Sequence, residues 1–166
     1  MRLIKKSFKY MVFHKYKSYF MTYLRFICYI YCYISFFMNE KMLKFVNIRQ
    51  ENPSKRSKIE RKIDFNEIYS EFINEKASQQ SSRCSQCGVP FCQVHCPLSN
   101  NIPDWLKLTA EGRVQEAYEL SQSTNNMPEV CGRICPQDRL CEGNCVIEKS
   151  GHGTVTIGSI EKYITE

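Results

Sequence analysis

The sequence lacks the residue patterns that enzymes use for substrate chemistry. It has only three histidines, and none of them belongs to a recognisable Ser/His/Asp or Cys/His set. It also has no paired-carboxylate site and no G-x-G-x-x-G motif, which would mark a dinucleotide-binding site. We therefore find no complete active site in this chain alone. Any part that it takes in catalysis is expected to be as one component of a larger enzyme.

Acidic residues are almost missing from residues 1–41, where Glu40 stands against eight Lys and Arg. This segment accounts for +7 of the formal charge, and because the whole chain carries +6, residues 42–166 carry −1. A domain that binds the phosphate backbone is expected to be basic itself. The charge distribution therefore argues against a nucleic-acid partner.

The aromatic, basic leader 1–41 also lacks a long apolar run. Its uncharged stretch Phe26–Met38 is shorter than the roughly 20 residues that span a bilayer, and no small-residue cleavage site follows it. Three interpretations stay open: translation that starts at Met38 or Met42, a membrane anchor, or a targeting segment. A membrane partner is expected only if the leader is translated; otherwise we expect a cytoplasmic protein.

Cysteine, in contrast, is abundant and clustered. Eight of the ten cysteines form two groups, with the patterns C-x2-C-x4-C-x3-C-P and C-x3-C-P-x4-C-x3-C. Thiolates at this density, with a Cys-Pro step in each group, are typical of iron–sulfur clusters and indicate electron transfer. The first group is Cys84, Cys87, Cys92 and Cys96, and the second is Cys131, Cys135, Cys141 and Cys145.

Two other uses of these cysteines compete with this interpretation. Four disulfides would suit a secreted domain, but the sequence has no convincing secretion signal. Zinc often binds C-x2-C pairs, and the second group has none, although two four-cysteine zinc sites are arithmetically allowed. Iron–sulfur clusters are the favoured interpretation, and a zinc-organised interaction module is the non-redox alternative.

The Cys-Pro steps suggest that the two groups exchange ligands. In two-cluster ferredoxins the cysteine before proline binds the other cluster. We therefore expect Cys84, Cys87 and Cys92 to hold one cluster while Cys96 reaches the second. One cysteine of the second group would then be the fourth ligand of the first cluster.

Apolar spacing predicts a mainly α fold. Residues 42–63 read as an extended arm, and 64–166 as a helical domain. Asp64 and Glu67 resemble a capping box before a helix of about 65–80. Further helices are expected from Asn100, over 113–121, from Asn125 and from Gly158, with a brief extended piece at 155–157. The apolar core is thin, so bound clusters are expected to stabilise the fold, and the apo-domain is expected to be largely unfolded.

Residues 83–166 resemble the N-terminal iron–sulfur domain of the glutamate synthase small (beta) subunit, a domain type also found in dihydropyrimidine dehydrogenase. The resemblance rests on RCSQCGVPFC (83–92), CPLSNNIPDWLKL (96–108), the segment 111–145 and VTIGSIEKYITE (155–166). It implies an alpha-helical ferredoxin-type domain with two 4Fe-4S clusters. These would relay electrons from NADPH and FAD, bound by a flavin domain, to the glutamate synthase large subunit. Another flavoprotein reductase of the same group is the alternative.

The ligand pattern of dihydropyrimidine dehydrogenase, carried over to matching positions, implies the ligands of each cluster. Glu161 stands where that relative has glutamine, so Cys131 is the alternative fourth ligand of the second cluster. The first cluster would be bound by Cys84, Cys87, Cys92 and Cys145, and the second by Cys96, Cys135, Cys141 and Glu161. The sequence stops at Glu166, where the family continues into its flavin domain, so a truncated fragment or a free-standing module is expected.

Overall fold

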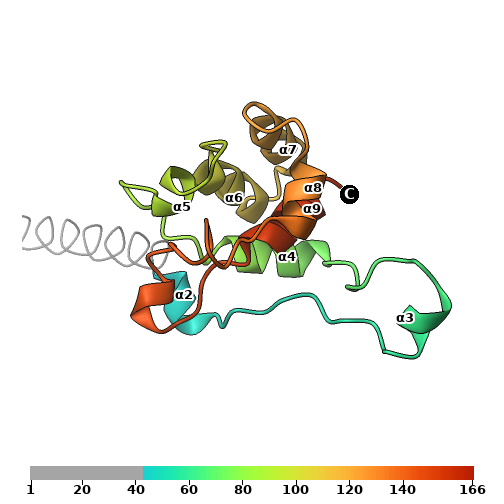
Figure 1. Cartoon of the computed structure of the whole chain (residues 1–166). Coiled ribbons are helices and arrows are strands. Elements are labelled where there is room, and N and C mark those ends of the chain that lie inside the picture. Colours follow the sequence, from blue (N-terminus) through green and yellow to red (C-terminus); the bar gives the residue numbers. More distant parts are fainter. Residues whose placement is uncertain (1–42) are drawn as a thin grey trace, which may run out of the picture. The chain divides into compact units, whose positions relative to one another are not determined.

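The computed structural model describes residues 43–166, which form short helices joined by long loops (Figure 1). Within this part of the chain there is no β-strand, and one isolated antiparallel bridge joins Lys55 to Tyr69. The predicted mainly α fold is confirmed. The helices are α2 (Lys44–Asn47), α3 (Glu60–Ile63), α4 (Asn74–Ser81), α5 (Phe91–Val94), α6 (Ile102–Ala110), α7 (Val114–Gln122), α8 (Pro128–Ile134), the 3-10 helix η1 (Glu148–Ser150) and α9 (Ile157–Ile164).

The predicted leader, residues 1–41, lies outside the described residues. Among residues 43–166, none of the helices has the length and apolar character needed to span a membrane.

Four of the predicted helices are confirmed as α6, α7, α8 and α9. Proline stands in the first turn of α6 and of α8, where its missing N–H leaves no helical hydrogen bond unmade. Gly112 separates α6 from α7 and has φ of +78°, a left-handed conformation that favours glycine. The turn brings α6 and α7 into contact.

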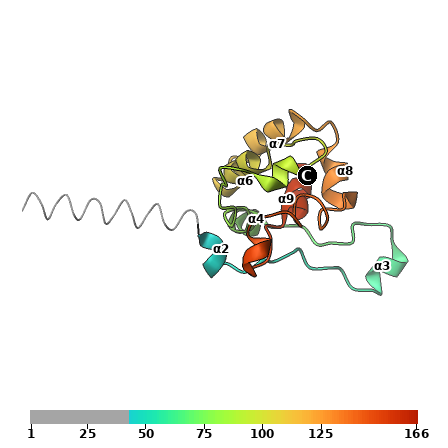
Figure 2. The ribbon, with the colours of Figure 1, turned by 60° about the vertical axis from the view of Figure 1, so that its left-hand side comes forward.

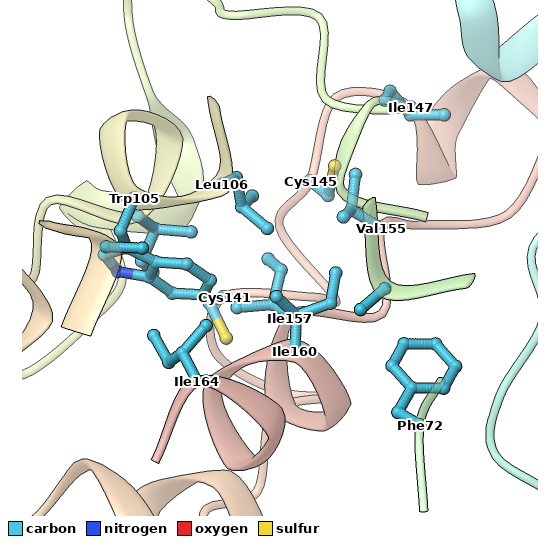
Figure 3. Packing of buried hydrophobic residues seen from close by; sticks show 13 residues of the cluster. Phe72, Trp105, Leu106, Cys141, Cys145, Ile147, Val155, Ile157, Ile160 and Ile164 are labelled. Atoms are coloured by element: carbon cyan, nitrogen blue, oxygen red, sulfur yellow. The ribbon is translucent and has the colours of Figure 1, made fainter. Parts of the chain in front are cut away.

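Helix α9 lies at the centre of the helical body and contacts α4, α6, α7 and α8. Its apolar face consists of Ile157, Ile160 and Ile164, all buried. Figure 3 shows these side chains between Trp105 on one side and Phe72 on the other. The core also contains Ala77, Ile102, Leu106, Ala117, Cys141, Cys145, Ile147 and Val155.

Helices α8 and α9 pack at very short range. A Cβ atom placed on Gly132 in α8 would lie 2.6 Å from the backbone nitrogen of Lys162 and 3.0 Å from the carbonyl oxygen of Gly158, both in α9. Only a residue without a side chain fits there. The contact matters for the site because α8 carries Cys131 and α9 carries Glu161.

The predicted helix at about 65–80 is wrong in its first half, because α4 begins only at Asn74. Asp64 does not cap a helix. Its carboxylate instead accepts hydrogen bonds from the Arg56 guanidinium, at 2.6 and 3.0 Å, and from the backbone N–H of Asn66 at 3.1 Å. Of the apolar residues that gave the helical spacing, Phe72 is buried, whereas Phe65 is fully exposed.

The chain between α2 and α4 forms an arm that runs out to α3 and back, away from the other helices (Figure 2). Its two sides are joined by backbone hydrogen bonds from Arg56 to Ile68 (2.9 Å) and from Ser70 to Ser54 (2.8 Å). Local pairing across the arm has thus replaced the expected helix. The proposed division into segments at 42–63 and 64–166 stays a prediction.

Candidate metal centre

The first cysteine loop leaves α4 and folds back through α5. Gln86, between Cys84 and Cys87, has φ of +51°, which is uncommon for a residue with a side chain. Its amide nitrogen donates to the carbonyl oxygen of Pro103 at 2.7 Å and lies 3.4 Å from the Cys84 sulfur. The turn is therefore held against α6, and Cys92 follows within the single turn of α5.

Cys145, from the other sequence group, joins the three thiols of this loop. Burial raises the pKa of Cys84 to about 11 and that of Cys92 to about 12, and the negative charge of Cys145 adds to both shifts. Burial also raises the pKa of Cys87, again with a contribution from Cys145. These four sulfurs are near enough to act on one another electrostatically, and they form the first donor group.

The second donor group lines a cavity of about 210 Å³. One buried water needs only about 10–15 Å³, so the cavity has room for a group of many atoms. Figure 3 shows Cys141 and Cys145 at separate places in the core. The donors around the cavity are Cys96, Cys131, Cys135, Cys141 and Glu161.

Glu161 brings a carboxylate to this cavity from α9. Its side chain is buried, and the burial raises its pKa to about 7. Asn125 donates a hydrogen bond from its side-chain amide to Oε1 of Glu161 at 3.2 Å. The Asn125 amide is itself oriented, because its oxygen accepts the backbone N–H of Met127 at 3.0 Å.

Cys131 lines the same cavity, so the structure brings together both candidates for the fourth position. Burial raises the pKa of Cys131, Cys135 and Cys141, and the charge of Glu161 adds to each shift. Four thiols and one carboxylate therefore surround a single cavity. A four-ligand site leaves one of these donors spare.

Sequence reasoning overlooked the side chains that orient these donors. Asn125 reads in the sequence as a helix start, yet it is 3% exposed and supports Glu161. Gln86 and Arg83 flank Cys84 without belonging to any spacing pattern. For Arg83 and Gln86 the available signal was their position beside Cys84 and Cys87, whereas Asn125 lies beside no cysteine. His95, by comparison, is exposed and bonds through Nδ1 to the carbonyl oxygen of Phe91 at 2.9 Å.

The donor chemistry fits iron–sulfur clusters. Thiols with raised pKa values keep their protons near neutral pH unless a metal displaces them, so metal binding here must release protons. Among residues 43–166, no three His, Cys, Asp or Glu side chains are close enough to hold one metal ion. Donors around a cluster of several irons are spaced more widely than donors around a single ion, so this finding does not argue against clusters.

Residues 61–166 match the family model described as dihydropyrimidine dehydrogenase domain II, 4Fe-4S cluster. The chain is 70% identical, over 77% of its length, to 27% of the glutamate synthase (NADPH) small chain of Azospirillum brasilense. It is 50% identical, over 78% of its length, to 27% of the Escherichia coli (strain K12) protein of the same name. A second protein of that strain, AegA, named provisionally as an oxidoreductase, is 49% identical over 69% of this chain and 17% of its own length. The chain thus spans about a quarter or less of these curated relatives.

Proposed function

The chain belongs to the dihydropyrimidine dehydrogenase domain II, 4Fe-4S cluster family, and on this premise we propose that it binds two 4Fe-4S clusters that relay electrons. It is an iron–sulfur module of the electron-transfer type. The proposal of two clusters rests on one observation above all, the separation of the donors into two groups: Cys84, Cys87 and Cys145 act on Cys92, and none of these four lines the cavity of the second group.

We assign one donor group to each cluster. Gln86 contacts the Cys84 sulfur, and Asn125 donates a hydrogen bond to Glu161, so these two side chains help to hold the donors in place. Each cluster, when bound, supplies one-electron redox chemistry. The first cluster takes Cys84, Cys87, Cys92 and Cys145, and the second takes Cys96, Cys135, Cys141 and Glu161, with Cys131 as the alternative to Glu161.

We further propose that the module serves an NADPH-dependent glutamate synthase. It would receive electrons from a flavin domain that binds FAD and NADPH, and pass them to the large subunit for glutamate biosynthesis. The identity of 70% and 50% to two proteins named as small chains of that enzyme supports this role. We place this activity in the cytoplasm, where cysteines stay reduced.

The similarity to AegA favours a second candidate, an iron–sulfur module of another NAD(P)H-dependent flavoprotein reductase. The cluster ligands would be the same in both cases. Glutamate formation by the complex that contains this chain, measured with NADPH, 2-oxoglutarate and glutamine, separates the two candidates.

The cluster proposal is tested by metal analysis of the full chain purified without oxygen. We expect about eight irons and about eight acid-labile sulfides per chain, because each cubane holds four of each. A broad visible absorbance that is lost on oxidation should accompany them. Stoichiometric zinc without sulfide would overturn the proposal and support the zinc-organised interaction module.

A further inference from the structure

Arg83 is a completely buried arginine, with 0% of its surface exposed. It follows α4 and directly precedes Cys84. Within residues 43–166 its guanidinium group donates only to main-chain carbonyl oxygens, which come from the arm and from the loop before α9. These acceptors are the carbonyls of Ile48 (3.0 Å), His152 (2.8 Å), Gly153 (2.9 Å) and Thr154.

The hydrogen bonds of Arg83 are satisfied, but its charge is not neutralised. No carboxylate within residues 43–166 forms an ion pair with it, and Glu148 acts on it only as a charge at longer range. Carbonyl dipoles stabilise a guanidinium without cancelling its charge. A buried charge without a counter-charge is costly, so its presence calls for an anionic partner.

The position of Arg83 indicates which anion this is. Besides preceding Cys84 in the chain, Arg83 interacts electrostatically with Cys145. Both cysteines belong to the first donor group. The second donor group differs in composition, because it includes the buried side chain of Glu161.

We propose that Arg83 is the counter-charge of the first cluster and raises the reduction potential of that cluster. The inference rests on the proposed function. A cluster bound by four thiolates is anionic, and it becomes more negative on reduction. A fixed cation beside it therefore favours the reduced form.

Substitutions of Arg83 can separate its charge from its hydrogen bonds. Arg83→Gln removes the charge and keeps an amide that donates hydrogen bonds. Arg83→Lys keeps the charge and loses the planar group that reaches several carbonyls. Gln80→Leu is the matched control, because Gln80 is neutral, equally buried, and also binds the arm, through Arg49 O at 3.0 Å and Glu51 N at 3.1 Å.

The measurement is a redox titration of the full chain with both clusters in place, followed by EPR, and Cys87→Ser identifies the first-cluster signal. For Arg83→Gln we expect the ratio of reduced to oxidised first cluster, measured at the wild-type midpoint potential, to fall at least tenfold. A tenfold change corresponds to a shift of 59 mV in the potential of a one-electron couple. Arg83→Lys should stay within about threefold of wild type. The second cluster, and both clusters in Gln80→Leu, should not change.

Three results would overturn the inference: an unchanged first-cluster potential in Arg83→Gln, an equal shift in Arg83→Lys, or an equal shift in Gln80→Leu. If neither Arg83 variant assembles the first cluster while both retain the second, Arg83 acts only by holding the backbone, and the tuning role is rejected. Failure of the proposed function is separate and visible in wild type, as a chain that does not contain two clusters.

Discussion

The two donor groups of this chain differ in number and in charge. The first has four thiols and a buried arginine beside it. The second has four thiols, a buried carboxylate and therefore one donor more than a cubane needs. We expect the first group to lose its cluster when one donor is removed, whereas in the second group the fifth donor can take the place of a lost ligand. Two similar cysteine patterns in the sequence thus lead to one site with four donors and one site with a spare donor.

Removal of both clusters should have the largest effect, because Cys141 and Cys145 are part of the apolar core as well as donors. We expect the apo-chain to lose most of its helical structure, since metal binding is coupled to folding in small domains with thin cores. Far-ultraviolet circular dichroism during a thermal melt, before and after extraction of iron and sulfide, measures this. A cooperative, native-like melt of the apo-chain would contradict it.

Cys145→Ala should remove the first cluster completely, because that group has no spare donor. We expect about half of the iron and sulfide to be lost, and the EPR signal of the second cluster to remain. Cys131→Ala is the matched control in the same sequence group. If Cys145→Ala retains the full iron content, the assignment of Cys145 to the first cluster is wrong.

In the second group, Glu161→Ala should alter the cluster while Cys131→Ala should not. We expect Glu161→Ala to shift the EPR spectrum, since the nearby Cys131 can replace the carboxylate. The double variant should lose the second cluster, which iron analysis would detect. The opposite result, in which Cys131→Ala bleaches one cluster and Glu161→Ala has no effect, would make Cys131 the ligand.

The smallest effect is expected from glycine substitutions, one in each region. Gly132→Ala should push α8 and α9 apart, because the new Cβ would lie 2.6 Å from the backbone nitrogen of Lys162. We expect the free energy of unfolding to fall by about 1–3 kcal/mol. Gly88→Ala, in the first cysteine loop, has no heavy atom within 4 Å and should change it by at most about 0.5 kcal/mol. Denaturant midpoints of the cluster-loaded chains compare the two; equal midpoints would show that the helix contact is not tight.

Much of the helical body could be predicted from the sequence. Pro103 and Pro128 mark helix starts by their restricted backbone, and apolar spacing indicates α7. The helix predicted over residues 65–73 does not form, because a helical spacing of apolar residues shows only that a helix there would have an apolar face. It does not show that the protein has a core for that face to contact. Here Asp64 finds Arg56 as a partner, and most of those apolar residues have no core to contact.

The structure brings together the donor sets that the family resemblance implied, although their role as ligands stays a prediction. Cysteine spacing alone indicates that Cys96 binds the second cluster and that one cysteine of the second group binds the first cluster. It does not identify that cysteine. The side chains that orient the donors could not be predicted in this way. Asn125 bonds to Glu161, and Arg83 bonds to distant carbonyl oxygens. Both contacts join segments far apart in the sequence, and no local pattern encodes them.

The crossing of donors between the two sequence groups also constrains how the protein is made. The first group begins at Cys84 and includes Cys145, and the four thiols of the second group run from Cys96 to Cys141. During synthesis, neither group therefore has four donors before Cys141 has left the ribosome. If these groups bind clusters, as proposed, the machinery that delivers iron and sulfide acts only after residue 141 has been made, and the two sites become complete within a few residues of each other.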